Sequence, residues 1–180
     1  ISSPNTEGLR DFHEKKELEN LLSSLSKIRK KNKINKPLFV KISPDLNYED
    51  ISNVYEIILK YKIDGIILSN TSDRNRENLL DQKKNEKGGL SGLPIKDIST
   101  NLIKKFYKET KGKISIIGVG GVDSGQGAFE KIAAGANAIQ LYTGMVYKGP
   151  GVVKDIKRSL IEILKKEKIS NISQVVGINS

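Results

Sequence analysis

Short apolar segments alternate with helix-forming segments along most of this chain, and this alternation restricts the possible folds more than any other feature. The apolar segments lie at residues 37–42, 65–68, 114–117 and 138–141. Between them, apolar residues recur at the three- and four-residue spacing of amphipathic helices. Repeated strand–helix units of this kind predict a parallel β-sheet in an α/β protein. The first apolar segment is almost continuous, which predicts a strand buried on both faces.

Two architectures suit this pattern, an open doubly wound sheet and a closed (β/α)8 TIM barrel. The carboxyl ends of all barrel strands surround one mouth, whereas an open sheet gathers ligand contacts only at its switch point. A polar cluster suited to ligand contact follows each strand, which favours the barrel. The clusters are Ser3-Pro4-Asn5, Lys41 with Ser43, Ser69-Asn70-Thr71, Gly120-Gly121 and Tyr142-Thr143.

The chain opens on Ile1, which runs straight into a polar, turn-forming cluster, as the last residue of a core strand would. A barrel needs eight strands and typically about 250 residues. We therefore expect residues 1–180 to form the C-terminal portion, roughly half, of one barrel domain, with the first strands upstream.

The chain has no cysteine, which excludes thiolate catalysis, disulfides and cysteine-based metal sites from it. Its one histidine, His13, stands among charged residues, and we expect it on the solvated surface. No second ligand at a suitable spacing accompanies it, so no metal site is predicted. A Ser–His–Asp hydrolase also lacks support, because no other histidine is available to activate a serine.

The net charge of +10 raises the alternative of a basic, non-catalytic nucleic-acid-binding domain. Only five of the 31 basic residues are arginine, and the lysines are scattered over most predicted helices. Aromatic residues, which stack on bases, make up 6% of the chain. This composition argues against a nucleic-acid partner. No apolar run approaches the roughly 20 residues of a membrane-spanning helix.

A glycine-rich turn, Gly118 to Gly121, separates a predicted strand from a predicted helix. Such a turn lets backbone N–H groups approach phosphate oxygens, although the spacing is not that of a dinucleotide fingerprint. Tyr142-Thr143-Gly144 follows the next strand. Loops after the last two barrel strands commonly form a phosphate site, so we predict phosphate binding here. A tight turn without a ligand is the alternative.

Lys41 lies within an apolar strand, where an unpaired ammonium is costly. We predict that it points into the site and meets an anionic ligand; snorkelling to water is the alternative. Asn70 and Thr71 offer amide and hydroxyl groups directly after a strand, where a simple asparagine turn would also fit. Residues 72–90 are polar and without periodicity, which is typical of a lid, a binding loop or a disordered segment.

Six segments in order, spread over the whole chain, resemble the class 2 dihydroorotate dehydrogenases, the quinone-linked FMN enzymes of pyrimidine synthesis. These segments are residues 2–10, 40–46, 64–71, 88–92, 116–122 and 140–143. The resemblance implies that dihydroorotate is oxidised to orotate, losing a proton from C5 and a hydride from C6 to the flavin. It assigns the base to Ser3. Serine there, rather than the cysteine of class 1 enzymes, points to class 2.

The resemblance also implies roles for the other polar residues. It places Asn5, Asn70 and Thr71 against the substrate. It brings Lys41 to the flavin ring, where a cation stabilises negative charge. The remaining residues implied to contact FMN are Ser69, which stands where relatives usually have threonine, Gly92, Gly120, Gly121, Tyr142 and Thr143.

Quinone use implies a peripheral membrane protein, on the cytoplasmic side of a bacterial inner membrane or on the mitochondrial inner membrane. The resemblance places the membrane-associating helices upstream of Ile1, and residues 1–180 alone are expected to be inactive. A class 1 dihydroorotate dehydrogenase, which uses fumarate or NAD, or another FMN barrel oxidoreductase is the alternative. Ser3 argues against it.

Overall fold

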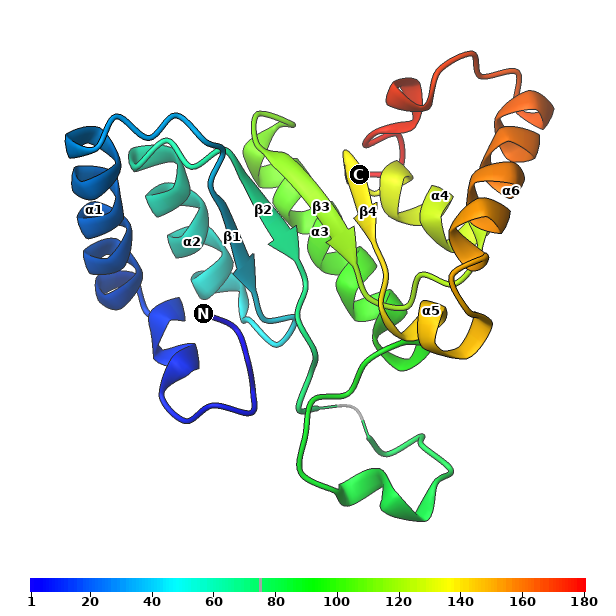
Figure 1. Ribbon diagram of the computed structural model, residues 1–180, viewed down its shortest axis with the longest axis horizontal. Helices are drawn as coiled ribbons and strands as arrows, with labels where there is room; N and C mark the ends of the chain where they lie inside the picture. Colours follow the sequence, from blue (N-terminus) through cyan, green and yellow to red (C-terminus); the bar gives the residue numbers. More distant parts are fainter. Residues whose placement is uncertain (75) are drawn as a thin grey trace.

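A four-stranded parallel sheet organises the fold (Figure 1). The structure, a computed structural model, describes residues 1–74 and 76–180. The strands are β1 (Phe39–Ile42), β2 (Gly65–Leu68), β3 (Ser115–Val119) and β4 (Ala138–Gln140), and each pairs in parallel with the next. A parallel sheet in sequence order has no switch point, as expected of a section of barrel wall. The four predicted strands are confirmed.

Helices separate the strands, as the sequence predicts. The α-helices are α1 (Lys15–Lys31), α2 (Tyr48–Lys60), α3 (Lys96–Thr110), α4 (Gly125–Ala133), α5 (Thr143–Lys148) and α6 (Val152–Lys166). The 3-10 helices are η1 (Leu9–His13), η2 (Gln82–Asn85), η3 (Leu93–Ile95) and η4 (Ile172–Val175). The described chain ends in the long helix α6 followed by the short 3-10 helix η4.

Side-chain caps fix where two of these helices begin. The Asn47 side chain accepts a hydrogen bond from the Asp50 N–H at 2.9 Å, and the Asp50 carboxylate accepts from the Asn47 N–H at 3.3 Å. This capping box satisfies backbone donors that have no partner within α2. Ser124 accepts from the Gly127 N–H at 3.2 Å and caps α4 in the same way.

The main hydrophobic core lies between the helices and one face of the sheet. Val40, Ile66 and Ile116 are in register across β1, β2 and β3, and each is at most 6% exposed. They belong to one buried cluster with Leu22 of α1 and Phe106 of α3. The alternation of strand side chains places this apolar face under the helices, and the helices are amphipathic for the same reason.

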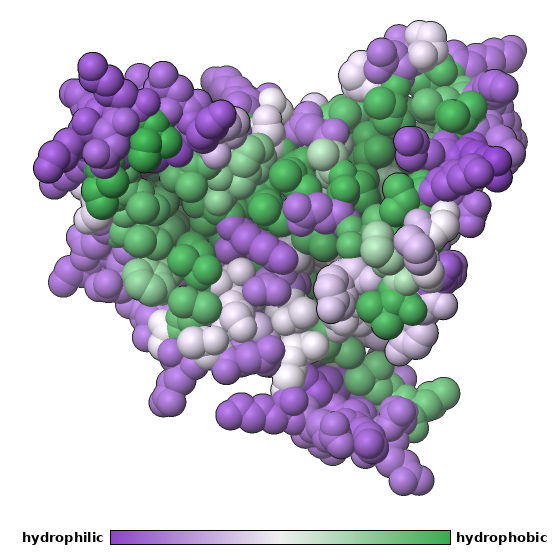
Figure 2. Space-filling model, in the orientation of Figure 1, coloured by the Kyte–Doolittle hydropathy of each residue, from purple (hydrophilic) through white to green (hydrophobic). Residues whose placement is uncertain are grey.

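The opposite face of the sheet carries Lys41, Ile67 and Ile117, which are also in register but only half-buried. The prediction that residues 37–42 form a strand buried on both faces is therefore wrong for the described chain. In a closed barrel, further strands would cover this inner face. Figure 2 shows hydrophobic side chains gathered over the middle of the molecule, between hydrophilic ends.

The expectation of a solvated His13 is wrong, because its residue is only 7% exposed. It ends η1, where the chain folds back before α1, and its Nε2 has no hydrogen-bond partner among the described residues. Burial, together with the cation of Arg10, lowers the pKa of His13 to about 4. The imidazole is therefore neutral in the folded protein at physiological pH.

We expect His13 to destabilise the full-length protein in mild acid. Its folded pKa of about 4 lies below the ordinary value of about 6.5, so the unfolded chain takes up the proton first as the pH falls. At pH 5 the loss of unfolding free energy from this group is about 2 kcal/mol. When the pH is lowered from 7 to 5, the urea midpoint of unfolding should fall less in His13→Gln than in the parent protein. An equal fall in both proteins would contradict this assignment.

Candidate active site

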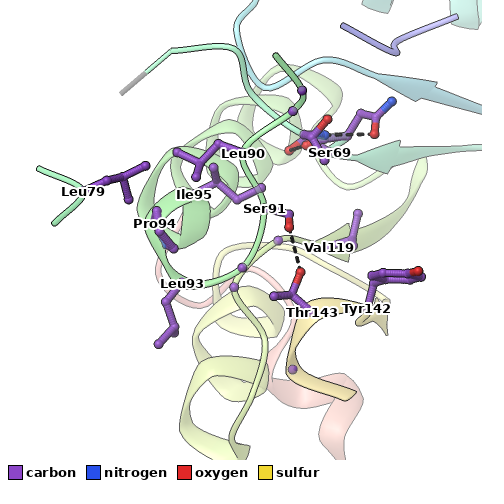
Figure 3. Close-up of a pocket in the computed structure, with 18 of the residues that line it drawn as sticks. Ser69, Leu79, Leu90, Ser91, Leu93, Pro94, Ile95, Val119, Tyr142 and Thr143 are labelled. Atoms are coloured by element: carbon purple, nitrogen blue, oxygen red, sulfur yellow. Dashed lines mark hydrogen bonds between the residues drawn. The ribbon is translucent and has the colours of Figure 1, made fainter. Parts of the chain in front are cut away.

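A cavity of about 970 Å³ opens at the carboxyl ends of the strands (Figure 3). Every strand contributes to its lining: Lys41 from β1, Ser69 after β2, Gly120 after β3 and Tyr142 after β4. A cavity of this size is in the range that holds a cofactor or a drug-sized ligand. The polar clusters after the strands of the sheet therefore share one cavity, as a barrel mouth requires.

Most of the residues predicted for the site line this cavity. They are Lys41, Ser69, Asn70, Thr71, Gly92, Gly120, Gly121, Tyr142 and Thr143. Two predicted residues, Ser3 and Asn5, are not among the lining residues. The structure thus brings the residues at the strand ends together in one cavity, whereas Ser3 and Asn5 lie outside the cavity lining.

The amino-terminal segment lies against the end of β2. The Asn70 side-chain amide donates to the Ser2 hydroxyl at 3.1 Å, and Ser2 is buried. The half-buried Ser3 accepts a hydrogen bond from the Asn5 N–H at 3.1 Å. Ser3 is therefore one residue away from a direct contact with a cavity-lining side chain, at the edge of the site.

Lys41 projects from the open face of the sheet into the cavity. It is half-buried, and among the described residues its ammonium makes no hydrogen bond or ion pair. A partly desolvated cation without a carboxylate partner is an attractive contact for an anionic ligand. This environment favours the predicted ligand role over simple snorkelling.

The glycine turn after β3 packs against the start of α3 more closely than side chains would permit. Gly121 has φ +70°, and a Cβ there would lie 2.5 Å from Lys96 Cβ and 2.8 Å from its Cα. A Cβ on Gly120, which has φ +117°, would lie 3.0 Å from Ser99 Cβ. The absence of side chains leaves the backbone of this turn facing the cavity. Such a turn suits a phosphate group.

The end of β4 is tied to the segment that precedes η3. Thr143 donates from its hydroxyl to the Ser91 hydroxyl at 2.9 Å (Figure 3). A Cβ on Gly92 would lie 2.9 Å from Thr143 Cγ2. Both segments line the cavity, so this contact fixes the cavity wall at the β4 end of the sheet. Lys41 lies at the other end of the sheet, on β1.

Residues 72–90 form a loop that is closed at its base and lines the cavity. Ser72 and Leu90 pair in an antiparallel bridge, with N···O distances of 3.0 and 2.6 Å. Arg76 donates to the backbone oxygens of Lys84 at 2.8 Å and Glu86 at 2.9 Å. Figure 1 shows the loop extending away from the sheet. Of the three alternatives for this stretch, a lid, a binding loop or a disordered segment, the described residues favour a loop beside the site; residue 75 lies outside the described ranges.

An ion-pair cluster around Asp45 joins three loops near the site. Arg10 contacts the Asp45 carboxylate at 3.1 Å and the Asp73 carboxylate at 2.8 Å. The Ser72 hydroxyl donates to the other oxygen of Asp45 at 2.6 Å. The cluster therefore links the amino-terminal segment, the turn after β1 and the base of the 72–90 loop.

Several lining residues were not predicted as site residues. Ser91, Val119 and Leu141 lie next to predicted positions, and Arg76 lies in the loop. Polar character does not identify Val119 and Leu141 as site residues, because apolar residues beside a strand usually belong to the hydrophobic core. Their neighbours in the sequence were the only available signal.

The fold and the cavity define an α/β protein of the parallel-barrel type, with its candidate site at the carboxyl ends of the strands. The family model for dihydroorotate dehydrogenase matches residues 1–164, and the chain belongs to this family. Its members are generally flavin-dependent. None of the helices in the described ranges combines the length and apolar character needed to span a bilayer.

Curated relatives carry the same family name. The dihydroorotate dehydrogenase (quinone) of Rippkaea orientalis is 46% identical over an alignment 186 residues long. The alignment covers 99% of this chain and 48% of the relative. The mitochondrial dihydroorotate dehydrogenase (quinone) of Mus musculus is 43% identical over 181 residues, covering 99% of this chain and 46% of the relative. The chain thus spans about half the length of the curated relatives it matches.

Solved structures agree with the barrel assignment. The crystal structure of the Eimeria tenella enzyme in complex with ferulenol matches with a TM-score of 0.94 and 35% identity. The match covers 99% of this chain and 52% of that one. The ligand-free enzyme from the same organism gives a TM-score of 0.93. The predicted (β/α)8 class is confirmed, with this chain supplying part of the barrel.

Proposed function

We propose that the full-length protein is a quinone-dependent dihydroorotate dehydrogenase that holds FMN and converts dihydroorotate to orotate in pyrimidine synthesis. Residues 1–180 would be the C-terminal portion of its one FMN-binding barrel domain. The main support is the convergence of Lys41, Asn70, Gly121 and Thr143 on one cavity at the strand ends. The names of the curated relatives support the reaction and the electron acceptor.

The chemistry of the residues around the cavity supports FMN as the ligand. The turn at Gly120 and Gly121 offers a bare backbone to the phosphate, and Thr143 with Gly92 forms the adjacent wall. Ser69 and Tyr142 complete the predicted contacts. When bound, the flavin supplies the acceptor for the hydride from C6 of the substrate. The ammonium of Lys41 lowers the energy of negative charge that develops beside it.

Polar side chains at the amino-terminal edge suit the flat, polar substrate. Asn5, Asn70 and Thr71 would bind its carboxylate and ring amides. Ser3 would take the proton from C5, which balances the hydride lost from C6. A serine hydroxyl is a weak base, so it needs a relay that carries the proton onward and a site from which bulk water is excluded. Residues of the 72–90 loop line the cavity, and in the full-length protein this loop would help to exclude water from the bound substrate.

The proposed partners follow from the same assignment. They are dihydroorotate, orotate and a quinone, with no nucleic acid. Membrane association would come from a segment outside residues 1–180, on the cytoplasmic side of a bacterial inner membrane or on the mitochondrial inner membrane. Residues 1–180 alone are expected to be inactive, because β1 and β4 have no outer neighbour in the sheet among the described residues, and such open edges are prone to aggregation.

An assay of the full-length protein with three electron acceptors tests the proposal. We expect flavin absorbance in the purified protein and orotate formation with a short-chain ubiquinone, but none with fumarate or NAD. Activity only with fumarate or NAD would replace the quinone assignment by class 1. Absence of flavin and of orotate formation, together with salt-sensitive binding of nucleic acid, would favour the basic binding domain instead.

A further inference from the structure

One lysine of α4 lies wholly inside the protein. Lys131 has 0% of its surface exposed. Its ammonium donates to the Ser99 hydroxyl at 3.1 Å, the Thr100 hydroxyl at 3.0 Å and the Lys96 backbone oxygen at 3.3 Å. These bonds use all three N–H groups of the ammonium, and all three acceptors are neutral oxygens at the amino-terminal end of α3.

The same end of α3 supports the glycine turn of the cavity. Lys96 and Ser99 are the residues against which Gly121 and Gly120 pack without room for a Cβ. The Ser99 hydroxyl also donates to the Val119 backbone oxygen at 2.5 Å. Lys131 therefore holds the residues on which the cavity-lining turn rests, and two successive hydrogen bonds connect its ammonium to that turn.

The charge of Lys131 has no carboxylate partner at hydrogen-bond distance among the described residues. The nearby Glu130 is paired with Lys96 at 2.6 Å. Burial, followed by the Lys96 cation, lowers the pKa of Lys131 to about 8, while Asp97 and Glu130 oppose this shift. An uncompensated buried cation is costly. An anion bound on the other side of the glycine turn would offset that cost.

We propose that Lys131 is a positioning residue of the cofactor-phosphate site. Its ammonium fixes the start of α3 against the turn at Gly120 and Gly121, and its charge attracts the phosphate from behind that turn. The inference rests on the proposed function, because it takes a phosphorylated flavin as the ligand. Lys131 makes no contact with substrate in this scheme and takes no part in a bond-forming step.

Two flavins that differ by the phosphate test this role in the full-length protein. Flavin is removed, and the dissociation constants of FMN and riboflavin are measured by fluorescence at pH 7. We expect Lys131→Met to raise the dissociation constant of FMN about tenfold or more, the size of a lost charge-assisted interaction. Riboflavin lacks the phosphate, so its constant should change less than about threefold. Lys104→Met, an exposed site on α3, is the matched control and should change neither.

The pH dependence gives a second readout that a purely structural role would not produce. In the parent protein, FMN binding should weaken as the pH rises above about 8, because Lys131 then loses its proton. Lys96 and Asp97 of α3 and Glu130 of α4 also face this group. Lys96 keeps its charge in this range, since Glu130 raises its pKa. The profile of Lys131→Met should be flat between about pH 7 and 9.

Equal loss of both flavins in Lys131→Met, or no loss of either, would overturn the inference. If that variant does not fold, Thr100→Val removes one acceptor and keeps the charge, and it should weaken FMN alone by about threefold. If the parent protein forms orotate and Lys131→Met binds FMN as tightly as the parent, only this inference is overturned. A parent protein that binds neither flavin overturns the proposed function as well.

Discussion

Ser3→Ala in the full-length protein is expected to lower kcat for dihydroorotate oxidation by about 10²–10⁴-fold, the range in which a positioned general base contributes. The reason is chemical: alanine has no oxygen to receive the C5 proton. The side chain does not line the cavity, so FMN content should be unchanged. Orotate formation with a quinone measures kcat, and the absorbance spectrum measures bound flavin.

Ser2→Ala is the matched control for this substitution. Ser2 accepts the hydrogen bond from Asn70, so its loss should disturb the orientation of a substrate-binding amide and act mainly on KM. A kcat of Ser3→Ala within about threefold of the parent would place the base elsewhere. A larger loss of kcat in Ser2→Ala than in Ser3→Ala would do the same.

Gly121→Ala is expected to raise the dissociation constant of FMN for the full-length protein at least about tenfold, which corresponds to about 1.4 kcal/mol of lost binding. An alanine Cβ would lie 2.5 Å from Lys96 Cβ and 2.8 Å from Lys96 Cα. The second contact is with backbone, which cannot move aside as a flexible side chain can. The turn must shift, and its N–H groups then no longer face the phosphate. Flavin absorbance per protein reports the loss.

Gly149→Ala separates this close approach from simple backbone strain. Gly149 has φ +71°, nearly the same as the +70° of Gly121, yet a Cβ there would meet nothing within 4 Å. Both substitutions place alanine at a positive φ, which strains an L residue even where space is open. We expect Gly149→Ala to retain its flavin. If it lost as much flavin as Gly121→Ala, contact with α3 would not explain the role of the turn.

The order of elements and the position of the site were predictable because both depend on local patterns. Apolar runs with turn residues after them predict buried parallel strands, and parallel strands bring their carboxyl ends to one edge. This is why Lys41, Asn70, Gly121 and Thr143, far apart in the chain, were expected together and line one cavity. The resemblance to a family added the chemistry, which the pattern alone leaves open.

Burial set by distant segments was not predictable. His13 was expected in solvent and Lys131 is a charged residue of an amphipathic helix, yet both are buried. Lys131 directly follows Glu130 in the sequence, and a lysine beside another charged residue gives no indication of burial. Only the packing of α3 against α4 directs its ammonium inward, onto Ser99 and Thr100. Charge alone gives no signal for such a position.

A crystal structure of the full-length protein with FMN and orotate tests most directly whether these strand ends form one flavin site. We expect the flavin ring within contact of Lys41, its phosphate on the backbone of Gly120 and Gly121, and the Ser3 hydroxyl facing C5 of orotate. A flavin bound outside this cavity, or a phosphate held by other loops with Gly121 facing solvent, would contradict the assignment.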